Sequence, residues 1–112
     1  MDYGLCLPNV RDSASPEGIE AAADVAERLG WSTVWTTDHV LVDRQSADEY
    51  GRVYEAILTL AWVGARHPRI RLGTSVIVVP QRNALLLAKE LATLDSLSGG
   101  RVIAGVGVGW SE

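Results

Sequence analysis

The sequence predicts an α/β fold with a parallel sheet, on the basis of three observations. Segments rich in β-branched residues alternate with segments whose apolar residues recur at helical spacing. Residues 72–79 and 101–108 are near-continuous apolar runs, which is typical of parallel strands covered on both faces. The connections between segments are mostly short. Periodicity alone leaves two architectures open, a doubly wound open sheet and a (β/α)8 barrel.

Seven elements are predicted, and local signals mark several of their ends. Ser15 can cap a helix that starts at Pro16, where no backbone N–H is needed, and Gly30 can end it in the left-handed conformation. Gly99 and Gly100 end the last helix in the same way. Residues 38–52 show neither period and predict a long loop. The elements are strands 3–7, 33–37, 72–79 and 101–108, and helices 16–29, 53–66 and 83–97.

Composition predicts one globular domain spanning residues 1–112. The net charge of −4 and the scattered Lys and Arg residues offer no basic stripe, so nucleic acid is not an expected partner. A lone cysteine, Cys6, cannot form an intramolecular disulfide and is expected to be buried in an apolar strand, which favours a reducing cytoplasm. No secretory signal or membrane-spanning run is expected, because the longest apolar stretch, residues 76–80, is far too short.

Two stretches of sequence carry a resemblance to a known family. They are TTDHV at the end of the second predicted strand, and LGTSVIVVPQRNALLLAKELATLDSLSGGRVIAGVGVGWSE at residues 72–112. Both resemble the bacterial luciferase-like monooxygenases, in particular the branch of probable F420-dependent (deazaflavin) or flavin-dependent oxidoreductases. The segments YGLCLPN and PEGIEAAADVAERLGW fit the same pattern. Because a full (β/α)8 barrel needs roughly 250 residues, the resemblance implies the amino-terminal half of a TIM barrel, with strands one to four and helices one to three.

His39 is the predicted catalytic residue. Asp38 and His39 follow the second strand, and the active face of such a barrel lies at the carboxyl ends of its strands. Without the resemblance, the better interpretation of the pair is a strand-capping Asp38 and a polar His39 at the start of a loop. The resemblance implies that His39 lies against the cofactor ring and the substrate as a general acid/base, with Asp38 in the cofactor site.

The remaining predicted cofactor residues lie on strands three and four. The resemblance implies a bulge at Thr74, Ser75 and Val76, with a non-prolyl cis peptide bond at Ser75-Val76 that presses on the ring; the alternative is a plain buried strand. It also implies that Gly107 and Gly109 let the backbone approach the ring, with Trp110 beside the ring or substrate. Some deazaflavin dehydrogenases carry a glutamate near this position, which Trp110 does not supply. Read alone, GVGVG is a weak dinucleotide-binding signal.

The aromatic and histidine residues outside these segments carry no predicted role in catalysis. Trp31, Trp35 and Trp62 are predicted to pack in the core. His67, next to Pro68 at a helix end, is given no function.

Three functional hypotheses follow from the resemblance. The first is a luciferase-like oxidoreductase that uses FMN with oxygen, or coenzyme F420 for hydride transfer. The second is a half-barrel that has lost cofactor binding and acts as an oligomerisation or partner-binding module. The third is a fragment of a longer enzyme. A half-barrel exposes two sheet edges and an apolar inner face, so we also expect self-association, most simply as a C2 dimer.

Overall fold

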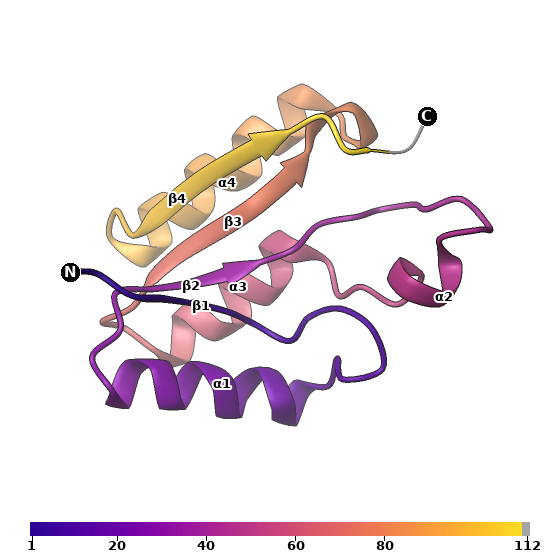
Figure 1. Cartoon of the computed structure of the whole chain (residues 1–112). Helices are drawn as coiled ribbons and strands as arrows, with labels where there is room; N and C mark the ends of the chain where they lie inside the picture. Colours follow the sequence, from indigo (N-terminus) through magenta and orange to yellow (C-terminus); the bar gives the residue numbers. More distant parts are fainter. Residues whose placement is uncertain (111–112) are drawn as a thin grey trace.

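A single four-stranded parallel sheet forms the centre of the computed structural model, which describes residues 1–110 (Figure 1). The strands are β1 (Gly4–Cys6), β2 (Thr33–Thr36), β3 (Arg71–Val78) and β4 (Val102–Gly107). They pair in chain order, and every pairing between strands is parallel. Doubly wound sheets reverse their strand order at a switch point, whereas a barrel adds strands consecutively. The observed order therefore selects the barrel architecture.

Three helices cover one side of this sheet (Figure 1). They are α1 (Pro16–Arg28), α3 (Ala56–Arg66) and α4 (Ala84–Ser98). A side-chain oxygen caps each amino terminus, from Ser15, Glu55 and Asn83 respectively. Gly30 and Gly99 have the predicted positive φ angles of 73° and 74°. No helix within residues 1–110 combines the length and apolarity needed to cross a bilayer.

The hydrophobic core fills the space between the sheet and these helices. Val34 and Leu72 point from the central strands toward α3, where Gly64 lets Leu72 pack directly on the helix backbone. The fully or largely buried apolar residues of the core are Leu7, Ile19, Ala23, Ala26, Val34, Ala56, Ile57, Leu60, Val63, Ile70, Leu72, Ile77, Leu87 and Leu94.

Trp35 lies on the opposite face of the sheet from the core, which is the inner face of the half-barrel. Strand neighbours alternate in direction, so Trp35 faces away from the side to which Val34 points. A Cβ on Gly4 of β1 or on Gly73 of β3 would collide with the Trp35 indole. The indole therefore spreads across three strands because its neighbours lack side chains. Trp31 packs against the edge of the core, as predicted. Trp35 packs against its strand neighbours on the inner face and not in the core, so the predicted core position was wrong for this residue.

Several local predictions were wrong. Cys6 is exposed, because in β1 it shares the inner-face row of Trp35 and no helix covers that face. Trp62 is 36% exposed, since it lies on the outward side of α3. Helix α3 starts at Ala56 instead of residue 53, because Val53 forms an antiparallel bridge with Val10. The loop after β2 contains one helical turn, α2 (Ala47–Tyr50), which no periodicity indicated.

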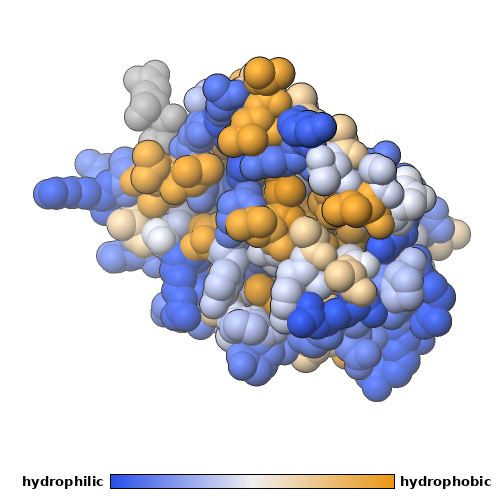
Figure 2. Space-filling view, turned by 180° about the vertical axis from the view of Figure 1, so that it is seen from behind, coloured by the Kyte–Doolittle hydropathy of each residue, from blue (hydrophilic) through white to orange (hydrophobic). Residues whose placement is uncertain are grey.

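The prediction that both faces of the last two strands are covered was also wrong for β4. Ala104 and Val106 alternate with half-buried residues and are exposed, Val106 by 59%. On α4, Leu87 and Leu94 are buried, whereas Ala84 and Ala88 are exposed. The reason is that β4 is an edge strand and α4 packs on one side only. Seen from behind, on the side where α3 and α4 lie, hydrophobic patches interrupt the hydrophilic surface (Figure 2).

A polar cluster closes the amino-terminal end of the sheet. His67 at the end of α3 is buried, with its Nδ1 3.2 Å from Glu27 Oε2 and its Nε2 3.3 Å from Glu20 Oε1. Burial by itself would raise the pKa of Glu27, but the hydrogen bond from the Arg69 backbone N–H and the contact with His67 outweigh it, so this pKa is lowered. This end lies away from the predicted site, so the cluster is structural.

Candidate functional site

Buried hydrogen bonds fix the segment that carries His39. Asn9, which follows β1 and is fully buried, donates from Nδ2 to the carbonyl oxygens of Thr37 (2.8 Å) and Tyr54 (3.1 Å). Its Oδ1 accepts the Thr37 N–H at 3.1 Å. One amide side chain thus ties together the chain after β1, the end of β2 and the start of α3. His39 lies two residues after this anchor.

Asp38 is held from the other side by β3 and the residues that follow it. Its carboxylate accepts the Val78 N–H (3.0 Å) and the guanidinium of Arg82 through Nε (3.1 Å) and Nη2 (2.5 Å). Arg82 also donates to Glu55 at 2.6 Å. Burial opposes the charge of Arg82, but the hydrogen bonds to Asp38 and Glu55 outweigh it and raise its pKa. Asp38 is 2% exposed, and its carboxylate is engaged by Val78 and Arg82. A direct contact between Asp38 and a cofactor stays a prediction.

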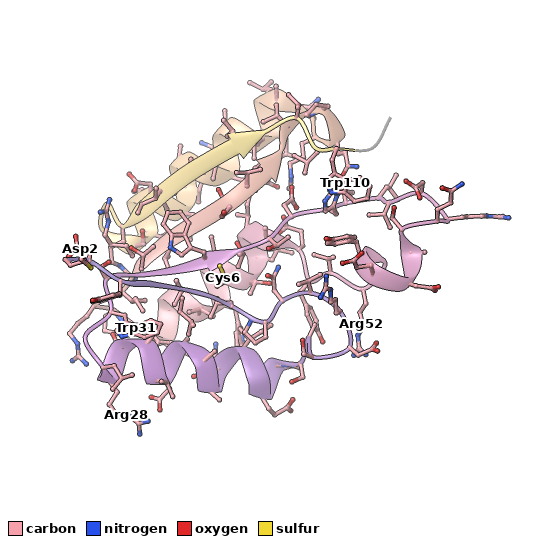
Figure 3. The ribbon with its side chains drawn as sticks, viewed as in Figure 1. Asp2, Cys6, Arg28, Trp31, Arg52 and Trp110 are labelled. Carbon is pink, nitrogen blue, oxygen red and sulfur yellow. The ribbon has the colours of Figure 1, made fainter. Side chains whose placement is uncertain are left out.

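The His39 imidazole belongs to a cluster of three aromatic rings at the carboxyl end of the sheet. Its ring centroid lies 5.5 Å from that of Trp110 and 5.7 Å from that of Tyr50. Tyr50 and Trp110 are 5.5 Å apart. In Figure 3, Trp110 lies above the segment that follows β2 and near the α2 turn, whereas Trp31 and Arg28 lie at the opposite end. The predicted catalytic residue and the predicted ring-binding tryptophan therefore share one rim.

Tyr50 was missed by the sequence analysis, and its position depends on contacts distant in sequence. The Arg11 guanidinium lies 5.6 Å from the Tyr50 ring centroid and forms an ion pair with Glu49. The Arg11 N–H donates to the Arg52 carbonyl at 2.8 Å. A turn at residues 43–46 could have indicated local structure in this loop, because an Asp side chain there accepts the backbone N–H of the residue three positions later.

Gln81 anchors the other end of the same loop. Its Oε1 accepts the N–H groups of Val40 (2.9 Å) and Leu41 (3.3 Å), and its Nε2 donates to the Leu41 carbonyl at 2.7 Å. The loop over the site is therefore pinned by side chains on both sides.

Strand β3 carries the predicted bulge. The peptide bond Ser75-Val76 is cis, and the β3–β4 register shifts between Thr74 and Ile77. The Thr74 hydroxyl bridges the irregularity, donating to the Gly105 carbonyl (2.8 Å) and accepting the Gly105 N–H (3.0 Å). Val76 is partly exposed at this point. The prediction of a cis bond and a bulge at these residues is confirmed.

The terminal glycines have a structural role that the sequence analysis did not foresee. A Cβ on Gly107 would lie 2.6 Å from Val76 Cγ2, and one on Gly109 would lie 3.0 Å from Val78 Cγ1. Side chains of β3 thus occupy the space above these glycines. The glycines let Val76 lie flat across β4, and the predicted approach of a cofactor ring to their backbone stays a prediction.

The family model for luciferase-like monooxygenases matches residues 1–112. The chain belongs to this family. An uncharacterized protein of Mycobacterium tuberculosis is 37% identical over 124 residues, an alignment covering 99% of this chain and 43% of that protein. An F420-dependent glucose-6-phosphate dehydrogenase of Kineococcus radiotolerans is 39% identical over 85 residues, covering 75% of this chain and 24% of the relative.

The solved structures agree with the sequence comparison. The crystal structure of the monooxygenase RslO1 from Streptomyces bottropensis superposes with a TM-score of 0.79 at 28% identity, covering 98% of this chain and 34% of that one. This chain therefore spans less than half the length of these relatives. The half-barrel reading of the fold and the luciferase-like family are both confirmed.

Proposed function

We propose that this chain supplies the half of a luciferase-like oxidoreductase that holds the ring of a deazaflavin or flavin cofactor, with His39 as general acid/base. The observation that carries the proposal is the contact between His39 and Trp110, 5.5 Å apart, from segments that follow different strands. Val76 is exposed on the neighbouring bulge. These residues suit a planar heteroaromatic ring in character, because they offer an apolar face, an indole and a proton-carrying imidazole.

The reaction class follows from the cofactor and from His39. Coenzyme F420 would supply hydride transfer, and reduced FMN would supply reaction with oxygen. Imidazole is suited to take or give a proton at neutral pH, and His39 is half-buried with its segment fixed by Asn9 and Asp38. The F420-dependent dehydrogenase among the relatives favours F420 over FMN. The single cysteine supports a cytoplasmic location.

Binding of the two cofactors tests the proposal. We expect equilibrium dialysis of the chain with F420, and separately with FMN, to show saturable binding of at least one. Val76→Asp should weaken that binding at least about tenfold, because a charge at the bulge would face an apolar ring. Trp31→Phe, at the opposite end of the sheet, is the matched control and should leave binding unchanged. Absence of binding for both cofactors, or equal loss in both variants, would refute the proposal for this chain.

A second candidate, an oligomerisation module without a cofactor, is favoured by the exposed edge strand. Val106 and Val108 on and after β4, and Leu85 and Leu97 on α4, are 59–83% exposed. Exposed apolar edges pair readily with other chains. In that case two copies would close a pseudo-barrel edge to edge or stack their inner faces, and Val106→Lys should abolish the dimer seen by sedimentation. A dimer that persists in Val106→Lys would count against this candidate.

A further inference from the structure

The three rings at the carboxyl end of the sheet leave no room for a fourth ring between them. The centroid distances among His39, Tyr50 and Trp110 are 5.5–5.7 Å, and the ring planes are inclined by 51–64°. A planar ring held between two others needs about 7 Å between them, because carbon atoms in contact lie about 3.5 Å apart. A ligand ring can therefore reach the side of the His39 imidazole that Tyr50 covers only after Tyr50 moves away.

Tyr50 is carried by a helical turn that buries little surface. It is the last residue of α2, and none of the residues in Ala47–Tyr50 is buried. Ser46, which precedes the turn, makes no side-chain capping bond. A segment with few buried contacts and exposed backbone hydrogen bonds opens locally at a small cost in free energy. The turn can therefore separate from the site while the rest of the fold stays intact.

The chain is fixed on both sides of this turn. Before it, the Gln81 side chain accepts the Leu41 N–H at 3.3 Å and donates to the Leu41 carbonyl at 2.7 Å. After it, Val53 forms the antiparallel bridge with Val10. Residues 42–52 thus connect two fixed points, and their movement need not disturb either one.

Arg11 holds the Tyr50 ring in place over the site. Its guanidinium lies 5.6 Å from the Tyr50 ring centroid and forms an ion pair with Glu49. The Arg11 backbone is itself fixed, since its N–H donates to the Arg52 carbonyl (2.8 Å) and its carbonyl accepts the Ala14 N–H (3.1 Å). The paired side chains of Arg11 and Glu49 are 55% and 56% exposed, so both contacts are weak. Weak contacts from a fixed backbone suit a latch that opens and closes.

We propose that Tyr50 is a gate over His39 and that Arg11 is the latch of this gate. In the closed state, Tyr50 and Trp110 shield the imidazole. In the open state, α2 moves away, the two contacts of Arg11 break, and a planar ligand stacks against His39 where the phenol ring was. The gate weakens ligand binding in proportion to the fraction of chains that are closed. The proposal rests on the proposed function, since the gate controls access to the residue proposed to react.

Acylation of the free chain by diethyl pyrocarbonate, followed by peptide mass spectrometry, tests the gate without any cofactor. The chain has two histidines, so His39 reports opening of the gate, and His67, which is 4% exposed, reports unfolding of the whole domain. When opening and closing are fast, the rate of modification follows the population of the open state. Arg11→Gln removes an exposed cation–π contact and an exposed ion pair, so it should raise the His39 rate about fivefold. The His67 rate should stay unchanged.

Two matched variants separate the latch from a direct effect of charge. Glu49→Gln breaks the ion pair and changes the local charge in the direction opposite to Arg11→Gln, yet it should also raise the His39 rate, by about twofold. A direct effect of charge on the imidazole would move the rate in opposite directions in these two variants. Arg28→Gln removes an exposed arginine at the far end of the sheet and should leave the His39 rate unchanged (Figure 3).

Removal of the gate itself completes the test. Tyr50→Ala should raise the His39 rate at least about fivefold, and adding Arg11→Gln should raise it no further, because the latch then has nothing to hold. An unchanged His39 rate in Arg11→Gln or in Tyr50→Ala would overturn the gate, and so would an equal rise at His67. The expected rates in a chain that binds neither F420 nor FMN would confirm the gate and refute the proposed function.

Discussion

Replacing Asp38 by alanine removes the acceptor around which the site end of the sheet is organised. The Asp38 carboxylate takes three hydrogen bonds, one from the Val78 N–H and two from Arg82, in a position that is 2% exposed. The substitution leaves the Val78 N–H without an acceptor. It also leaves Arg82, 10% exposed, with Glu55 as its remaining partner.

The cost can be worked from these contacts. A buried N–H without a partner costs about 1–3 kcal/mol, and removing one member of a buried ion pair costs about 3–5 kcal/mol in all. Because Glu55 still compensates part of the Arg82 charge, we expect Asp38→Ala to lower the free energy of unfolding by about 3 kcal/mol. For a domain of this size, such a loss corresponds to a fall in Tm of about 12 °C or more.

Urea unfolding followed by far-UV circular dichroism measures this cost. Asp24→Asn, an exposed carboxylate on α1, is the control and should change stability by less than about 0.5 kcal/mol. In the double variant Asp38→Ala/Arg82→Met, the loss should be smaller than the sum of the single losses by about 1–3 kcal/mol, because the unpaired charge is gone. A loss below about 1 kcal/mol for Asp38→Ala, or additive losses in the double variant, would show that the pair does not organise this region.

Three further predictions concern separate parts of the molecule. Gly64→Ala should lower the free energy of unfolding by about 1–3 kcal/mol in a urea titration, since the new Cβ would lie 2.5 Å from Cδ1 of the buried Leu72; an unchanged or higher stability would contradict this. Because folding lowers the pKa of Glu27, its carboxylate adds to the free energy of unfolding at pH values above the usual glutamate pKa. This stabilisation is lost as the pH falls through the folded-state pKa. Glu27→Gln should therefore make the free energy of unfolding fall less steeply as the pH is lowered. An unchanged slope would show that Glu27 does not cause this pH dependence. Arg11→Gln should release the Tyr50 ring, seen as a loss of ring-current shifts in NMR spectra, and shifts that persist would mean that Arg11 does not hold it.

The order of elements was predictable because each depends on local signals. The cap at Ser15 and the positive-φ glycines at positions 30 and 99 fixed helix ends that need no information from elsewhere in the chain. The predicted start of α3 was wrong because the true start depends on residues distant in sequence. Val53 bridges Val10, and Asn9 binds the Tyr54 carbonyl, so these residues are held extended in spite of their apolar pattern.

Residues of the site were predictable only where a short, continuous stretch of sequence contains them. His39 and the bulge at residues 74–76 were identified through the family resemblance; the structure places His39 against Trp110 and the bulge within β3. Tyr50 could not be found, because α2 has a single turn with no period and its ring is placed by Arg11, 39 positions earlier. Cys6 and Trp62 were misplaced for a related reason: apolar patterning shows that a residue can be buried, while the layer outside it decides whether it is.

Side-chain packing on the inner face of the sheet accounts for Gly73, and no cofactor is needed to explain it. Barrel interiors are packed in layers whose large side chains come from alternate strands. The register places Cys6, Trp35, Gly73 and Ile103 in one inward row across β1 to β4, so the large residues come from β2 and β4 and the small ones from β1 and β3. Barrel layering therefore requires a glycine here to admit the Trp35 indole. Gly73→Ala should therefore displace the Trp35 indole and change the near-UV circular dichroism of the protein. The distant ring cluster of His39 should stay unchanged.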